Sequence, residues 1–101
     1  VPAIQQALGR ADLKTEDLDL IEINEAFSAQ YLGCEKELGR ERDKCYVNGG
    51  AIARGHPLGA TGTRLLLTLV RELEQSGKAL GCARWTIWRN RYTLSVFWGY
   101  R

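Results

Sequence analysis

The chain has few of the residues that form covalent or metal cross-links. Its 101 residues include one histidine and three cysteines, an odd number without a C-x-x-C pair. This usage argues against a disulfide framework and against a zinc site, so we expect no metal. Free thiols of this kind fit a reducing intracellular compartment.

Long apolar runs and a recognisable leader are also missing. No apolar stretch is long enough to cross a bilayer, and no secretory signal pattern is present, so we expect no membrane partner. The chain begins with Val1 rather than Met, which leads us to expect a further part upstream.

Acidic residues are absent after Glu74. Residues 1–75 hold nine basic and twelve acidic residues, whereas residues 76–101 hold five basic residues, no acidic residue and all three tryptophans. So abrupt a change in composition indicates that the two segments of the chain differ in origin or environment. A basic tail with aromatics resembles a nucleic-acid contact. Because the tail has no binding motif, we expect no nucleic-acid partner.

The hydrophobic pattern that remains is that of one small domain. Apolar spacing predicts a helix over 2–9, a strand over 18–24, a helix from 25 to 38 and a helix from 63 to about 76. A strand over 78–83 and an imperfect strand over 92–98 follow. In the first strand we expect Leu18 and Leu20 to face one way, with Ile21 and Ile23 facing the other. The element order predicts an α/β fold with layered α-β-α architecture.

One histidine lies in the most unusual stretch, residues 48–62, which contains five glycines. His56 sits between Gly55 and Pro57, and its side chain exchanges protons near neutral pH. Glycine allows backbone angles and close approaches that other residues resist, while Pro57 disfavours a helix just before it. The pattern predicts an imidazole on a tight loop before a helix; the alternative is a lone histidine in a turn.

A second candidate is Asn24, at the end of the first strand. Its amide can hold a water or fix a backbone group; the alternative is that it only caps the next helix. Glu25 would then favour the helix dipole without any function. The expected apolar stripe of that helix consists of Phe27, Tyr31, Cys34 and Leu38, which makes Cys34 a small core residue.

Residues 21–27 and 48–62 resemble two motifs of thiolases, which make or cleave 3-ketoacyl-CoA thioesters. The first resembles the Asn-Glu-Ala-Phe motif and the second the histidine signature, both of the C-terminal domain. The resemblance covers residues 1–83. It implies an incomplete thiolase-like α-β-α domain with a mixed sheet covered by helices. One sheet face would then lack its cover and expose apolar surface.

The resemblance also implies roles for individual residues. His56 would be the general base that generates a thiolate, and an oxyanion donor. Asn24 would hold the water of the oxyanion hole. Ala26, Phe27 and Gly55 would bind substrate. The reaction would be acyl transfer between a 3-ketoacyl-CoA or acetyl-CoA thioester and coenzyme A, by thiolytic cleavage or Claisen condensation, without a cofactor.

Acyl-CoA or coenzyme A is the implied partner, and the intact family member would be a homo-oligomer. We expect a mitochondrial, peroxisomal or cytoplasmic location and favour the mitochondrial one. An alternative is a non-catalytic interaction module that associates with intact thiolase subunits. A ketosynthase-like condensing enzyme is disfavoured, because the two motifs together indicate the thiolase branch.

The chain departs from the thiolase pattern at its cysteines. The acyl-accepting cysteine of thiolases lies in their N-terminal half, and neither Cys34 nor Cys45 has a matching context. A second catalytic cysteine, in a Cys-x-Gly-x-Gly context, belongs near Arg84, where this chain has no such glycines. We therefore expect the isolated chain to be inactive. We also hypothesise that the basic, Trp-rich segment 84–101 comes from another reading frame or a splice error.

Overall fold

The computed structural model describes residues 1–39, 42–45, 47–86 and 93–99. In chain order its elements are α1 (Pro2–Arg10), a 3₁₀ turn (Thr15–Asp17), β1 (Leu20–Ile23), α2 (Ser28–Leu38), a 3₁₀ turn (Arg42–Lys44), α3 (Ala51–Arg54), α4 (Thr61–Ser76), β2 (Leu80–Thr86) and β3 (Thr93–Gly99). Among the described residues, no helix is both long and apolar enough to cross a membrane.

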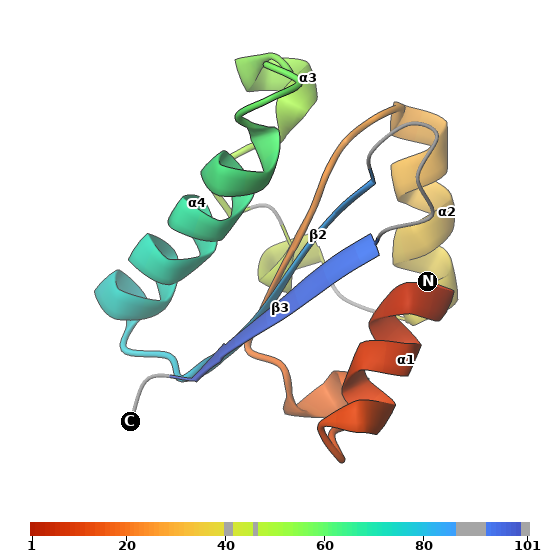
Figure 1. Ribbon diagram of the computed structural model, residues 1–101, viewed down its shortest axis with the longest axis vertical. Helices are drawn as coiled ribbons and strands as arrows, with labels where there is room; N and C mark the ends of the chain where they lie inside the picture. Colours follow the sequence, from red (N-terminus) through yellow and green to blue (C-terminus); the bar gives the residue numbers. More distant parts are fainter. Residues whose placement is uncertain (40–41, 46, 87–92, 100–101) are drawn as a thin grey trace.

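The three strands form one mixed sheet in the order β1-β2-β3 (Figure 1). β1 runs parallel to β2, with Leu20 opposite Gly81, and β2 runs antiparallel to β3, with Leu80 opposite Gly99. A parallel pair needs a long crossover, and here the chain from α2 through α4 provides it. The prediction of an α/β fold with a mixed sheet is confirmed.

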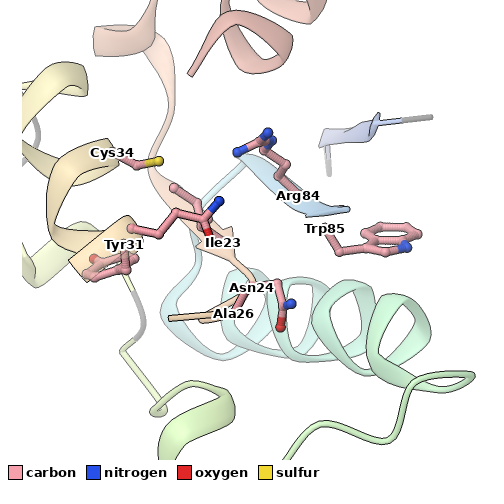
Figure 2. A pocket seen from close by; sticks show the side chains of 8 residues that line it. Ile23, Asn24, Ala26, Tyr31, Cys34, Arg84 and Trp85 are labelled. Atoms are coloured by element: carbon pink, nitrogen blue, oxygen red, sulfur yellow. The ribbon is translucent and has the colours of Figure 1, made fainter. Parts of the chain in front are cut away.

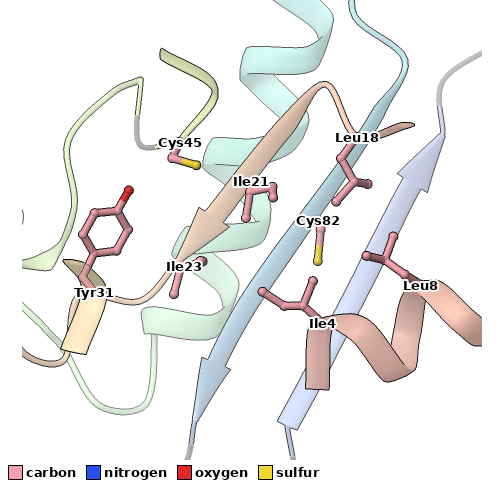
Figure 3. Packing of buried hydrophobic residues seen from close by; sticks show 8 residues of the cluster. All are labelled: Ile4, Leu8, Leu18, Ile21, Ile23, Tyr31, Cys45 and Cys82. Carbon is pink, nitrogen blue, oxygen red and sulfur yellow. The ribbon is translucent and has the colours of Figure 1, made fainter. Parts of the chain in front are cut away.

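Helices cover the sheet on two sides. On one face, α1 and α2 pack against β1 and β2, as Figure 3 shows. On the other face lies α4, the most amphipathic of the long helices, whose buried leucines contact Leu20 and Ala83. The first cluster consists of Ile4, Leu8, Leu18, Ile21, Ile23, Tyr31, Cys45 and Cys82. The second consists of Leu20, Leu65, Leu69, Leu73 and Ala83.

For β1 and for residues 80–85 of β2, whose burial the structure describes, this layering corrects the expectation of an uncovered sheet face. The described side chains of β1 are buried on both of its faces. Exposed apolar side chains lie instead on helices and loops, among them Phe27 (74% exposed) and Leu58 (85% exposed). The reason is that α4 packs back onto β1 and β2 within this chain, so that face of these two strands is covered.

Two expectations at the ends of β1 are wrong. Leu18 packs with Ile21 and Ile23 rather than with Leu20, because it precedes the strand and the two-residue alternation does not reach it. The next helix begins at Ser28 and not at residue 25. Residue Phe27 is still extended, with a φ of −145°, and its side chain points away from the core stripe that holds Tyr31.

Strand β2 continues across the boundary predicted at residue 83. Its partner β3 lies within the predicted atypical segment 84–101. Residues 87–92 and 100–101 of that segment lie outside the described residues. The domain boundary and the origin of the segment therefore stay predictions.

Candidate functional site

Asn24 follows the last residue of β1 and continues its pairing with β2. Its backbone N–H donates to the Arg84 carbonyl at 2.9 Å, and its own carbonyl accepts from the Ala26 N–H at 2.9 Å. The residue that precedes α2 is Phe27, and no side chain caps that helix. The alternative in which Asn24 only caps the following helix is therefore wrong. Its side-chain amide is left available at the end of the strand.

Asn24 lines a small pocket between β1, β2 and α2, but Figure 2 shows its amide directed toward α4, whereas the Arg84 side chain extends to the other side of the strands. Asn24 Oδ1 and Arg84 Nε are both buried, and neither has a hydrogen-bond partner among the described residues. Buried polar atoms normally have partners, so each of these two atoms indicates room for a polar partner such as a water. The lining residues are Ile23, Asn24, Ala26, Gln30, Tyr31, Cys34, Arg84 and Trp85.

Cys34 lines this pocket and is not fully buried in the core. The residue is half-buried rather than buried, in contrast to Cys82. Figure 2 shows it on α2, across the pocket from Arg84. The expectation that Cys34 is simply a small core residue is therefore corrected in part.

The glycine-rich stretch is not entirely loop, because residues Ala51–Arg54 form the short helix α3. Gly55 ends it with a φ of +89°, a conformation that a residue with a Cβ adopts only at a cost. The chain then runs exposed through His56 to residue 60. The predicted tight turn before a helix is confirmed, since α4 begins at Thr61.

The imidazole of His56 is held by the first residue of α4. His56 Nδ1 lies 2.7 Å from Thr61 Oγ1, and the same hydroxyl donates to the Pro57 carbonyl at 3.0 Å. A hydroxyl has one proton, so the arrangement that satisfies both contacts has Thr61 accepting from Nδ1–H. Neutral His56 then carries its proton on Nδ1. Its Nε2 lone pair remains free to accept a proton.

Two polar contacts fasten the stretch 48–62 to the rest of the molecule. At its start, Asn48 Nδ2 donates to Glu72 Oε2 of α4 at 2.8 Å. In its middle, the Ile52 N–H donates to Glu25 Oε2 at 3.0 Å. Glu25 therefore bonds to the glycine-rich stretch, and the expectation that it only favours the dipole of a helix beginning at its own position is wrong.

A packing contact connects the pocket to the start of α4. The indole of Trp85, which lines the pocket, lies against Gly62, where an added Cβ would come within 2.6 Å of Trp85 Cζ2. Only glycine allows this approach. Gly62 directly follows Thr61, the residue that holds His56. The pocket wall and the support of the imidazole therefore belong to one packed unit.

A buried carboxyl lies on the α4 side of β1. Glu22 is 2% exposed, and its Oε2 has no hydrogen-bond partner within the described part of the chain. Burial raises the pKa of Glu22 to about 7, while the positive charges of Arg64 and Arg54 oppose the rise. Such a shift places the proton equilibrium of this carboxyl near neutrality. No sequence pattern singled out Glu22 beyond its position in a strand.

The structure brings some of the predicted site residues together and not others. Asn24 and Ala26 line the same pocket, whereas His56, Phe27 and Gly55 are not among its lining residues and are exposed. Four residues that complete the arrangement were not recognised from the sequence as having these roles. They are Glu25, Thr61, Arg84 and Trp85. For Thr61 a signal was present, since a hydroxyl in the first turn after His-Pro is well placed to reach the ring.

Comparison with known proteins decides the family. A sequence model of the thiolase C-terminal domain matches residues 1–88. The chain belongs to the thiolase family. The predicted resemblance is thereby confirmed, and its matched range extends beyond residue 83.

Individual thiolases are similar over most of this chain. Acetyl-CoA acetyltransferase of Escherichia coli K12 is 54% identical over 83 residues, 82% of this chain and 21% of the relative. The 3-ketoacyl-CoA thiolase of Aliivibrio salmonicida is 47% identical over 100 residues, 96% of this chain and 26% of the relative. Human mitochondrial 3-ketoacyl-CoA thiolase, solved in complex with CoA, aligns with a TM-score of 0.91 at 42% identity, covering 100% of this chain and 26% of that chain. The chain therefore spans about a quarter or less of the length of these thiolases.

Proposed function

We propose that this chain carries the histidine and asparagine part of a thiolase acyl-transfer site. The observation that carries the proposal is the fixed His56 ring, with Nδ1 on Thr61 and Nε2 free, in a chain of this family. The acyl-accepting cysteine would come from polypeptide outside these 101 residues. The chain by itself would then be inactive, because residues of such a site act as a unit.

The role assigned to each residue follows from the hydrogen-bonding and proton-transfer properties of its side chain and from its exposure. His56 Nε2 would take the proton of a thiol, since the thiolate is the reactive nucleophile, and the resulting imidazolium would donate to the developing oxyanion. Asn24 would hold a water that donates to the same oxygen, and the buried, unpartnered Oδ1 of Asn24 is free to accept a hydrogen bond from that water. Ala26, Phe27 and Gly55 are exposed and would contact the substrate.

The substrate would be a 3-ketoacyl-CoA or acetyl-CoA thioester, with coenzyme A as the second partner and no further cofactor. Support comes from the relatives, which are named for these compounds, and from the human structure with CoA. As the family resemblance implies, the intact protein would be a homo-oligomer. A mitochondrial, peroxisomal or cytoplasmic location, with the mitochondrial one favoured, fits three thiols without a disulfide.

A chimera tests the proposal. The segment of the Escherichia coli relative that matches this chain is replaced by residues 1–83, so that the host supplies the remaining residues of the site. We expect thiolysis of acetoacetyl-CoA by the chimera. His56→Ala should lower kcat/KM by about 10²–10⁴-fold, the usual contribution of a general base. Asn24→Ala should lower it by about 10²-fold through the lost oxyanion contact.

The isolated chain serves as the reference and should show no thiolysis. Turnover by the isolated chain that His56→Ala abolishes would contradict the need for an outside cysteine. An active chimera that His56→Ala leaves unchanged would overturn the proposed role of His56. In both experiments Glu37→Ala is a matched control, because Glu37 is exposed on α2 and lies outside the pocket that Asn24 lines.

A second candidate, an interaction module that associates with intact thiolase subunits, is favoured by the exposed apolar side chains of Phe27, Ile52 and Leu58. The test is co-purification of the chain with a full-length thiolase. Binding that Leu58→Ser weakens would support it, and absence of binding at micromolar concentrations would count against it.

A further inference from the structure

Two motifs that are separated in the sequence meet at a single carboxylate. Glu25 follows Asn24, while its Oε2 accepts from the Ile52 N–H at 3.0 Å, within the stretch that carries His56. Ile52 belongs to α3, and the chain passes from α3 through Gly55 directly to His56. A hydrogen bond to an ionised carboxylate is stronger than a neutral one. This contact therefore restrains the stretch between its two ends.

We propose that Glu25 is a positioning residue, whose carboxylate holds the loop that carries His56 against the strand end that carries Asn24. The inference rests on the proposed function, because it assigns to Glu25 the relative placement of the two groups that act on the thioester. Glu25 itself touches neither His56 nor the reacting atoms.

Gly50 gives independent support. It is buried, and a Cβ added to it would lie 2.6 Å from Glu25 Cδ and 2.9 Å from Cγ. Its φ of −106° and ψ of −162° are accessible to any residue. Glycine at position 50 is therefore required by the close approach of Glu25 and not by the backbone. The loop leaves a space that the Glu25 side chain fills.

Glu25 also belongs to the charged surroundings of the buried Glu22. Glu25 is close enough to the buried Glu22 to raise the pKa of that carboxyl, whereas Arg54 of α3 and Arg64 of α4 lower it. Glu72 adds a further negative charge from α4 and is bonded to Asn48. Charges of both signs therefore surround the buried Glu22, and the carboxylate of Glu25 is one of them. Its bond to the Ile52 N–H gives it a defined partner there.

Hydrogen exchange at the Ile52 amide, followed by NMR in the 101-residue chain, tests the contact itself. Glu25→Ala should accelerate exchange at Ile52 by at least about tenfold, since it removes the acceptor. Glu25→Gln keeps an acceptor oxygen and should restore most of the protection. Gly50→Ala should accelerate exchange as Glu25→Ala does, by displacing the carboxylate. Glu37→Ala, an exposed change on α2, is the matched control and should leave the Ile52 amide unchanged.

Kinetics in the chimera test the positioning role. Glu25→Ala should lower kcat by about 10–100-fold, because small misplacements of a catalytic group are costly, and should change KM by less than about threefold. Glu25→Gln should recover most of kcat. A purely structural role would instead lower the folded fraction of Glu25→Ala and leave kcat per folded molecule unchanged.

The outcomes separate this inference from the proposed function. An Ile52 amide that stays protected in Glu25→Ala, or a kcat that stays unchanged, overturns the inference even where His56→Ala shows the proposed function to be correct. A chimera with native Glu25 that is inactive, although exchange at Ile52 responds as expected, overturns the proposed function and with it the role of Glu25 in catalysis. The expected result is loss of protection and of kcat in Glu25→Ala, with rescue of both in Glu25→Gln.

Discussion

The end of β1 and the glycine-rich stretch 48–62 place their functional side chains by opposite means. Asn24 lies at the end of a fully buried strand, and its backbone is fixed by pairing with Arg84. His56 lies on an exposed segment, and its ring is fixed by one contact to Thr61. One group depends on the core, whereas the other depends on a few polar bonds and on glycine.

This difference indicates which substitutions should disturb Asn24 and which should disturb His56. Changes in the core should act on the strand end through the stability of the whole domain, because β1 is buried on both faces. Changes in the stretch 48–62 should lower the global stability less than changes in the core do, because few apolar contacts are involved. The four predictions below test this contrast in order of expected effect.

The largest effect is expected in the core beneath β1. Leu69 is fully buried on α4, and Leu69→Ala should lower the free energy of unfolding by about 3 kcal/mol through lost burial and a residual cavity. Leu67→Ala, on the exposed side of the same helix, should cost less than about 1 kcal/mol. Urea denaturation followed by circular dichroism measures both. Equal losses would show that α4 does not pack on the sheet in this way.

Glu22 should make stability depend on pH. Its pKa in the folded protein is about 7, against an ordinary value of 4.5, so the folded state binds more protons than the unfolded state between these pH values. The free energy of unfolding should therefore fall as the pH rises through this window, by about 3 kcal/mol in total. Glu22→Gln should remove most of this fall.

Urea titrations of the native chain and of Glu22→Gln at pH values below 4.5 and above 7 measure the difference. Glu37→Gln is the control, because Glu37 is exposed on α2 and should leave the pH dependence as it is. A native chain that is as stable above the window as below it contradicts the burial of an ionisable Glu22.

Gly55 should show a smaller and more local effect. Gly55→Ala places a Cβ on a residue with a φ of +89° and should cost about 1–2 kcal/mol. Gly59→Ala is the matched control in the same stretch, because no atom lies within 4 Å of the added Cβ and φ is not positive there. Differential scanning calorimetry should give a lower Tm for the first variant only.

The smallest change in stability is expected for Thr61. Thr61→Val keeps the buried volume and removes the hydroxyl, at a cost of about 1 kcal/mol. Without the hydroxyl, nothing selects the Nδ1–H form of His56. The ¹⁵N shifts of the imidazole should then move toward a tautomer mixture. Thr61→Ser keeps the hydroxyl and should retain the shifts of the native chain; identical shifts in Thr61→Val would contradict the hydrogen bond.

Much of the fold could be predicted because it follows from local patterns. The spacing of Ile4 and Leu8 predicted α1, the leucines of α4 predicted its buried face, and Gly77 marked its end in the left-handed conformation. The two motifs placed Asn24 at a strand end and His56 before a helix. These features depend on the periodicity of apolar residues and on backbone preferences within one turn or one strand. Both are set by residues that are close together in the sequence.

The sequence by itself determined the family, the mixed α/β order and the two candidate groups, since periodicity and motif spacing are properties of neighbouring residues. Only the tertiary structure decided that Leu18 joins the cluster of Ile21, that Phe27 is exposed, and that Glu25 bonds to Ile52 rather than favouring a helix start. The physical reason is distance along the chain. The bond between residues 25 and 52 depends on how β1, α2 and α3 pack, and no local preference of either residue specifies it.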